Sequence, residues 1–311
     1  MKPYNRLTPR MALQLAAPHT WVASVGPAVF AVVASAQAGR PLALWRGALL
    51  VLACVLMQAA VNTLNDYADF VSGTDQATDN VAKNDATLVY EHINPIHARH
   101  LGVAFLAAGA LAGVIGSVPN LGVPLAVGLI GGAVVVLYSA GPAPVSQLPL
   151  GEVVSGGVMG GFIPLGITAA ADNRFHPEIL LISLPFVIGI GLIMMTNNGC
   201  DIEKDRAAGR RTLPALLGRR RTVAGYRFGV VLWLVALAAL PWVAFGPWGL
   251  LAPALVLALA WRPFWQLLRT GLQPEGRIRQ MQGIAKANAL AGGACIFAAA
   301  AALLAEVAGW M

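Results

Sequence analysis

The sequence is poor in charged residues. Asp, Glu, Lys and Arg make up 11% of its 311 residues, whereas an ordinary soluble domain contains about 25%. Hydrophobic residues account for 57% of the chain. This composition excludes a soluble globular protein and predicts a multi-pass membrane protein, with a single domain over residues 1–311.

Cysteine is scarce as well. Cys54, Cys200 and Cys295 are widely separated and form no Cys-x-x-Cys pair, so the sequence predicts neither a zinc site nor a disulfide framework. No small-residue cleavage site follows the first apolar segment. We therefore expect this segment to span the membrane rather than to act as a signal peptide.

Apolar runs of about 20 residues locate the membrane spans. We predict an all-α integral membrane protein with nine transmembrane helices, which form a bundle around a central cavity. The predicted spans are residues 12–36, 43–65, 97–117, 121–139, 150–171, 178–198, 223–244, 247–268 and 285–308. Most connections between them are short, as expected for antiparallel neighbours in a helical bundle.

Basic residues are unevenly distributed among the connections. With a cytoplasmic N-terminus, 18 of the 21 Lys and Arg residues fall on the cytoplasmic side, and only Arg40, Arg46 and Arg174 fall on the other. This asymmetry predicts a protein of the cell (inner) membrane whose C-terminus lies outside. The net charge of +7 then indicates lipid headgroups or a substrate phosphate as partners, and no nucleic acid.

Acidic residues are the rarest charged type, and their placement is informative. The chain has 14 of them, and nine lie in two regions: Asp66, Asp69, Asp75, Asp79, Asp85 and Glu91 in the first, and Asp201, Glu203 and Asp205 in the second. A carboxylate near or inside the membrane costs several kcal/mol unless it is paired or binds a cation. The two clusters therefore predict a cation site on the cytoplasmic side.

The spacing within the clusters supports this interpretation. Asn65 and Asp69 are four residues apart, and Asn197 is followed by Asp201 and Asp205 at the same interval. On a helix, residues four apart share one face. Mg2+ prefers oxygen ligands and is often completed by substrate phosphates. The repeated pattern favours a magnesium site over two solvated helix ends.

Several motifs together resemble the UbiA superfamily of membrane prenyltransferases. The first cluster reads NDYAD at 65–69 followed by GTD at 73–75, and the second reads NNGCDIEKDRAAGRRTL at 197–213. Further matches are APHTW at 17–21, YSAGPAP at 138–144 and the Gly151-Glu152 pair. Within the superfamily, the paired asparagines and the AGRRTL ending are most similar to the branch that prenylates 1,4-dihydroxy-2-naphthoate in menaquinone biosynthesis.

The resemblance implies a site for each substrate. It places Mg2+ against the diphosphate of a polyprenyl donor, with Asn65, Asp66, Asp69, Asp201 and Asp205 as metal ligands. It gives catalytic roles to Asp66, Asp69, Asp201, Asp205 and Tyr138, the last beside the aromatic acceptor or the allylic cation. The substrate-binding residues that it implies are Asn65, Asp75, Lys83, Asn197, Asn198 and Arg206.

Two departures from this branch leave the acceptor open. Cys200 stands where the branch often has arginine, and residues 76–85 lack the expected Arg-rich stretch. We expect Cys200→Arg to be tolerated, with activity on 1,4-dihydroxy-2-naphthoate at least about a tenth of the parent. Another aromatic acceptor therefore remains an alternative, and the sequence specifies neither the prenyl chain length nor the oligomeric state.

Two functions of other classes also use membrane carboxylates. An ion-coupled secondary transporter usually places them near mid-span beside broken helices, whereas the clusters here lie at helix ends on one side. An alcohol phosphotransferase needs one continuous motif, whereas about 130 residues separate the two clusters. Metal-dependent release of diphosphate from a prenyl donor distinguishes the predicted enzyme from both.

Overall fold

A computed structural model describes residues 4–73 and 87–310, and in these two ranges the chain is predominantly helical. Helices suit a membrane protein because each satisfies its backbone hydrogen bonds within one segment. The first half contains α1 (Pro9–Leu15), α2 (Val22–Gln37), α3 (Leu44–Val71), α4 (Thr87–Glu91), α5 (Pro95–Ser117), α6 (Gly122–Ser139), α7 (Gly151–Ser155) and α8 (Ile163–Asp172). The second half contains α9 (Glu178–Ile182), α10 (Leu184–Cys200), α11 (Ile202–Ala207), α12 (Leu213–Leu217), α13 (Arg219–Phe245), α14 (Leu251–Leu255), α15 (Trp261–Arg269) and α16 (Arg277–Val307).

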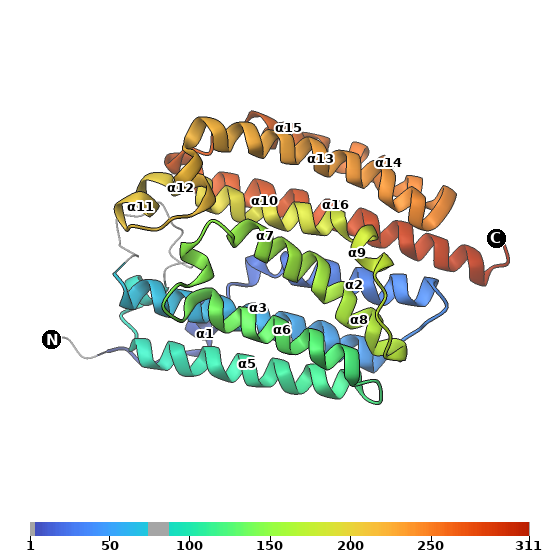
Figure 1. The fold of residues 1–311 in the computed structure, drawn as a ribbon, viewed down its shortest axis with the longest axis horizontal. Coiled ribbons are helices and arrows are strands. Elements are labelled where there is room, and N and C mark those ends of the chain that lie inside the picture. The colour runs from blue at the N-terminus through green and yellow to red at the C-terminus, as the bar shows by residue number, and fades with distance from the viewer. Residues whose placement is uncertain (1–3, 74–86, 311) are drawn as a thin grey trace.

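The long helices run side by side in one bundle (Figure 1). We call the end that carries α11, α12 and the end of α3 the motif end, and the opposite end, where the C-terminus lies, the far end. Among the described residues, six helices are long and apolar enough to cross a membrane, or seven if the bent pair α1–α2 forms one span. One of the six is residues 219–269, although α14 and α15 return beside α13. The all-α membrane fold is confirmed, and the number nine stays a prediction.

The first predicted span, 12–36, is wrong as a continuous helix. The chain bends by 64° between Pro9–Thr20 and Val22–Gln37. Ala17 adopts a left-handed backbone conformation with φ of +48°, and Pro18 cannot donate a backbone hydrogen bond to a helix that would continue through it. Hydropathy cannot detect such a break because the segment stays apolar on both sides of it.

Glycines bring the segment after α7 against α10. Residues Gly156–Phe162 form a π-helical segment between α7 and α8. A Cβ atom at Gly156 would lie 2.5 Å from the carbonyl oxygen of Val187, and one at Gly160 would lie 2.3 Å from the Val187 nitrogen. No larger residue fits at these two contacts. This close approach places the start of α7 beside the end of α10, where the second motif begins.

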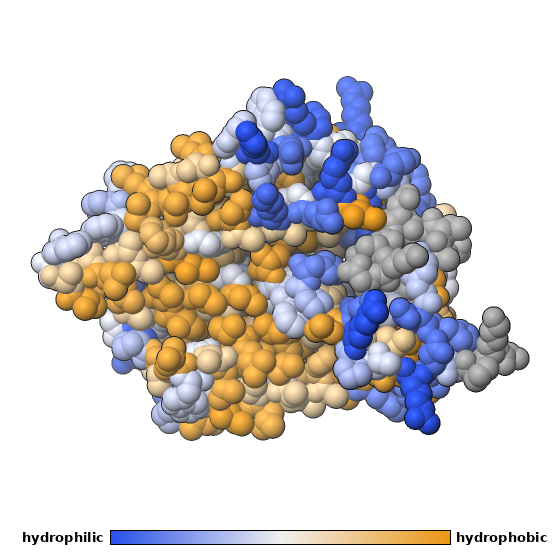
Figure 2. Space-filling view, turned by 180° about the vertical axis from the view of Figure 1, so that it is seen from behind, coloured by the Kyte–Doolittle hydropathy of each residue, from blue (hydrophilic) through white to orange (hydrophobic). Residues whose placement is uncertain are grey.

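The surface of the bundle is apolar over most of its length. Figure 2 shows a broad hydrophobic region, with hydrophilic residues concentrated toward one end. Large apolar side chains such as Leu129, Leu257 and Phe228 are exposed, which suits contact with lipid tails rather than water.

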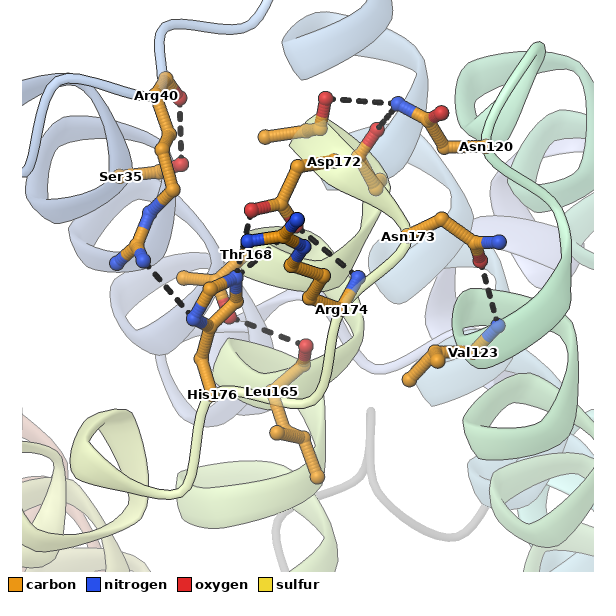
Figure 3. Close-up of polar contacts among 12 residues, drawn as sticks. Ser35, Arg40, Asn120, Val123, Leu165, Thr168, Asp172, Asn173, Arg174 and His176 are labelled. Atoms are coloured by element: carbon orange, nitrogen blue, oxygen red, sulfur yellow. Dashed lines mark hydrogen bonds and ion pairs between the residues drawn. The ribbon is translucent and has the colours of Figure 1, made fainter.

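Polar groups at the far end hold the helix ends together (Figure 3). Asn120 donates to the carbonyl oxygens of Ala170 and Ala171, and His176 contacts Asp172 and Arg40. The Asn120 contacts satisfy carbonyls that the end of α8 leaves without a helical partner. Arg46, at the start of α3, donates to the Ala170 carbonyl as well and to the Gly116 and Ser117 carbonyls at the end of α5.

Candidate active site

An elongated cavity lies inside the bundle. It has a volume of about 680 Å³, within the range of roughly 300–1,000 Å³ that is usual for small-molecule sites. Asp66 and Asn197 line it at the motif end, and Ser117 and Leu121 line it toward the far end. Most of the remaining wall consists of Gly, Ala, Val, Leu, Ile and Met side chains. The cavity therefore combines a polar, charged end with a long apolar interior.

The first acidic motif occupies the last turns of α3. The Asn65 amide donates to Asp69 Oδ2 at 2.9 Å, and the Ser139 hydroxyl donates to Asn65 Oδ1 at 3.0 Å. The predicted sharing of one helix face by Asn65 and Asp69 is thus confirmed. Asn65, Asp66 and Asp69 all line the cavity, and α6 holds the asparagine in place through Ser139.

The second motif is not one continuous helical stripe, contrary to our expectation. Helix α10 ends at Cys200, and Asp201 has φ of −101° and ψ of 17° before α11 begins. The chain turns there, so Asp205 does not continue the face of Asn197. Asn197 and Asn198 line the cavity, whereas Asp201 and Asp205 do not.

Asp205 is packed beneath α12. Its side chain is 3% exposed and accepts a hydrogen bond from the Thr212 hydroxyl at 2.8 Å. Burial raises the pKa of Asp205 to about 6, although Thr212 and Arg210 act in the opposite direction. In this structure the carboxylate therefore organises the α11–α12 loop from behind the cavity wall.

Two arginines connect the acidic residues. Arg210 donates to Asp69 Oδ1 at 3.0 Å and lies 3.7 Å from Asp205 Oδ1, so it bridges the two motifs. Arg277, at the start of α16, donates to Asp201 at 3.1 Å and to Asn197 Oδ1 at 2.5 Å. Both arginines line the cavity. They supply the positive charge that carboxylates need in a poorly solvated site.

The sequence indicated Arg277 only weakly. It is 76 residues from Asp201 and lies in a connection that contains several other basic residues, so no local spacing distinguishes it from them. Arg210 belongs to the second motif, but its contact with the first motif is a tertiary one. Charge balance is the one available signal, since two acidic clusters require nearby cations.

The remaining predicted residues have different positions. Asp75 and Lys83 lie outside the described residues. The Arg206 Nε donates to the Ala215 carbonyl oxygen at 2.8 Å, so this arginine fastens α12, and its binding of a diphosphate stays a prediction. Cys200 is fully buried in the core cluster. This burial contradicts the premise that position 200 faces the cavity, and we now expect an arginine there to disrupt the packing.

A third group of polar residues lies on α6, α7 and α10. Tyr138 and Asn198 line the cavity, and the Tyr138 hydroxyl donates to the Met194 sulfur at 3.3 Å. The Asn198 amide donates to Glu152 Oε1 at 3.0 Å. Glu152 is 8% exposed, and its Oε2 atom accepts no hydrogen bond from the described residues. This carboxylate fixes the Asn198 amide, a role that sequence reasoning missed.

The donor chemistry fits a magnesium ion. Carboxylate and amide oxygens are the ligands that Mg2+ takes in proteins, and Asn65, Asp66 and Asp69 offer them along one wall. No cluster of three His, Cys, Asp or Glu residues at metal-binding distance occurs within 4–73 and 87–310. The arrangement of the described residues is instead one in which arginines hold Asp69 and Asp201.

Comparison with known proteins agrees with the geometry. The UbiA prenyltransferase family matches residues 24–282. The chain is 33% identical to the 1,4-dihydroxy-2-naphthoate octaprenyltransferase of Bacillus subtilis over 238 residues, which cover 74% of this chain and 75% of that protein. It is 30% identical to the protein of the same name from Mycobacterium tuberculosis over 245 residues, which cover 73% of this chain and 80% of the relative.

Solved structures share the fold. A UbiA homolog from Archaeoglobus fulgidus, bound to DMAPP and Mg2+, superposes with a TM-score of 0.64 at 18% identity and covers 92% of this chain and 98% of its own. A digeranylgeranylglyceryl phosphate synthase gives a TM-score of 0.61 at 18% identity, with 94% and 98% covered. These likenesses show the fold, and the family match covers most of the chain. The protein is therefore a multi-pass membrane enzyme that belongs to the UbiA prenyltransferase family.

Proposed function

We propose that the protein transfers a polyprenyl group from polyprenyl diphosphate to an aromatic acceptor in a reaction that requires Mg2+. The acceptor that we propose is 1,4-dihydroxy-2-naphthoate, on which the two curated relatives are named to act. The observation that carries the proposal is the cavity, which has carboxylates and arginines at one end and an apolar interior. A prenyl diphosphate has the same division between a charged head and an apolar tail.

The acidic motifs would hold the metal. Asn65, Asp66 and Asp69 line the cavity. Asp201 and Asp205 do not line it in this structure, so they would complete the proposed ligand set only after their side chains turn toward it. When bound, Mg2+ neutralises charge on the diphosphate and so makes it a better leaving group. The Archaeoglobus fulgidus homolog, which has the same fold, binds DMAPP and Mg2+.

Arg210 and Arg277 are placed to bind the diphosphate. Each lines the cavity and carries a guanidinium group next to a carboxylate of the proposed metal site. A guanidinium group can donate two parallel hydrogen bonds to phosphate oxygens. Because negative charge increases on the diphosphate as it departs, fixed positive charges there lower the barrier to the reaction.

The proposed transfer begins with cleavage of the bond between the first prenyl carbon and the diphosphate oxygen. The electron pair leaves with the diphosphate, and an allylic cation remains. An electron-rich ring carbon of the acceptor then bonds to that cation and regains aromaticity by losing its proton, or its carboxyl group as CO2. The ring face of Tyr138, which lines the cavity, can stabilise the cation, and the apolar walls limit the access of water to it.

We further propose that the motif end faces the cytoplasm of the cell (inner) membrane, with the C-terminus outside. Arg40 and Arg174 lie at the far end (Figure 3), and Arg46 donates to the Gly116 and Ser117 carbonyl oxygens at the end of α5. The other 18 Lys and Arg residues are distributed over the rest of the chain. The positive-inside rule supports this orientation. Magnesium would then reach the site from the cytoplasm, and the released diphosphate would leave to the same side.

Purified protein in detergent tests the function directly. It would be incubated with Mg2+, prenyl diphosphates of several lengths and a panel of aromatic acceptors, and the products identified by mass spectrometry. We expect prenylated naphthoate products and equimolar diphosphate, both abolished by EDTA. Transfer to a different ring alone would refute the proposed acceptor, and no transfer to any ring would refute the proposed function.

A further inference from the structure

A further polar region interrupts the apolar wall of the cavity. It lies where α1 gives way to α2 and on the facing part of α3. We call it the glutamine wall, and its members are Gln14, His19, Thr20, Gln58 and Asn62, all of which line the cavity. No step of the proposed transfer uses these side chains.

The glutamine wall continues from the first acidic motif. Gln58 and Asn62 are four residues apart on α3, and Asp69 follows Asn62 by seven residues, so the three share one face of the helix. Gln58 and Asp66 are separated by about 12 Å along the helix axis, at 1.5 Å per residue. A ligand held by the wall would therefore lie deeper in the cavity than the diphosphate, toward the apolar interior that would take the prenyl chain.

The break after α1 is fastened firmly against α3. The Ala16 carbonyl oxygen accepts hydrogen bonds from Trp21 Nε1 at 2.9 Å and from the Asn62 amide at 3.2 Å. The same Asn62 amide donates to the Thr20 hydroxyl oxygen at 2.9 Å, and the Thr20 hydroxyl donates to the Ala17 carbonyl at 2.9 Å. The hydrogen bonds of Asn62 and Thr20 thus stabilise the break between α1 and α2.

The side-chain amides of Gln14 and Gln58 are not held by strong hydrogen bonds of this kind. Gln14 Oε1 and Gln58 Oε1 are enclosed, and neither accepts a hydrogen bond from any described residue. The Gln58 amide nitrogen contacts Thr20 and Asn62 only at 3.4 and 3.5 Å, so its amide can rotate without losing a strong hydrogen bond. An enclosed amide oxygen without a donor is unfavourable, and a bound hydroxyl group would supply the missing donor.

We propose that the glutamine wall is the binding subsite for the aromatic acceptor and that it recognises ring hydroxyl groups, which donate to the Gln14 and Gln58 oxygens. This inference rests on the proposed function. The members of the wall include no lysine or arginine, so the wall offers an anionic group no permanent positive charge, whereas a hydroxyl group needs none. Both amide oxygens are acceptors, which matches a ring that carries more than one hydroxyl.

Equilibrium binding of two probes to the purified protein tests the inference. The probes are 4-hydroxynaphthalene-2-carboxylate and naphthalene-2-carboxylate, which differ by one hydroxyl group. A hydrogen bond to an enclosed acceptor changes affinity by up to about tenfold. We expect the wild-type protein to bind the hydroxylated probe about tenfold more tightly, and the Gln14→Met/Gln58→Met variant to bind the two probes within about twofold of each other.

The controls separate recognition from damage to the fold. Affinity for naphthalene-2-carboxylate should stay within about threefold in the double variant, because it makes no hydroxyl contact. Gln37→Met introduces the same change at a glutamine that pairs with Glu306 outside the cavity, and it should preserve the preference. If the double variant does not fold, the single variants Gln14→Met and Gln58→Met replace it, each expected to reduce the preference.

Two results would overturn the inference: equal binding of both probes by the wild-type protein, or an unchanged preference in the glutamine variants. Prenyl transfer by the wild-type protein is measured in parallel. Transfer to 1,4-dihydroxy-2-naphthoate with an unchanged preference in the variants would leave the proposed function intact and refute the subsite alone. Loss of the preference without any transfer would refute the function and keep the hydroxyl-binding site.

Discussion

Replacement of Arg277 tests whether the guanidinium groups act on the leaving diphosphate. Arg277 lines the cavity and donates to both Asp201 oxygens at 3.1 and 3.2 Å and to Asn197 at 2.5 Å. Its side chain is 13% exposed, so its charge is weakly screened. Loss of one donor to a developing anion lowers kcat by about 100- to 1,000-fold, equivalent to about 2.7–4 kcal/mol.

We therefore expect Arg277→Met to reduce kcat for prenyl transfer by at least about 100-fold at saturating donor and Mg2+. Arg277→Lys keeps the charge but loses the fork geometry and should recover part of that loss. Arg279→Met is the matched control, because Arg279 is exposed on the same helix and does not line the cavity. Diphosphate release and product mass measure the rate, and Arg277→Met activity within about threefold of wild type would refute the reasoning.

Four further results are expected. Asp69→Asn and Asp201→Asn should each abolish most transfer in a protein that stays folded in detergent, and near-normal turnover would remove that residue from the site. Cys200→Arg should lose folded protein by size-exclusion and thermal melt, because burying an unpaired arginine costs several kcal/mol, whereas Cys200→Ala should stay folded. Glu152→Ala should lower activity, and Glu152→Gln, which still accepts the asparagine amide, should restore much of it; equal loss in both would indicate a need for the charge. A single cysteine in segment 203–222, in a cysteine-free background, should resist an impermeant reagent outside whole cells, and labelling would reverse the proposed orientation.

Local spacing predicted the first motif but not the second. Asn65 and Asp69 lie within one unbroken helix, so their four-residue interval is enough to place them together. Asn197 and Asp205 have equally regular spacing, but α10 ends between them. The spacing alone is compatible with a helix that continues past Cys200 or ends there, and the packing of α11 and α12 determines that it ends. A repeat of four therefore predicts a shared face only as far as the helix extends.

Hydropathy predicted the membrane fold, but it did not predict which side chains line the cavity. Apolar composition locates spans because lipid exposure requires it over the whole segment. Apolar composition contains no signal for the break at Ala17, for the burial of Cys200, or for the contact of Arg277 with Asp201. These features depend on which helices meet, and that information is not contained in the composition of any one of them.

The bridge made by Arg210 has a consequence for the order in which the protein is assembled. Arg210 and Asp69 are 141 residues apart in the chain, and the helices between them must be synthesised and inserted before the two can meet. The ribosome therefore delivers α3 to the membrane long before its arginine partner exists. The two halves of the active site can be joined only late in biogenesis, after α10 and the loop that follows it have reached their places.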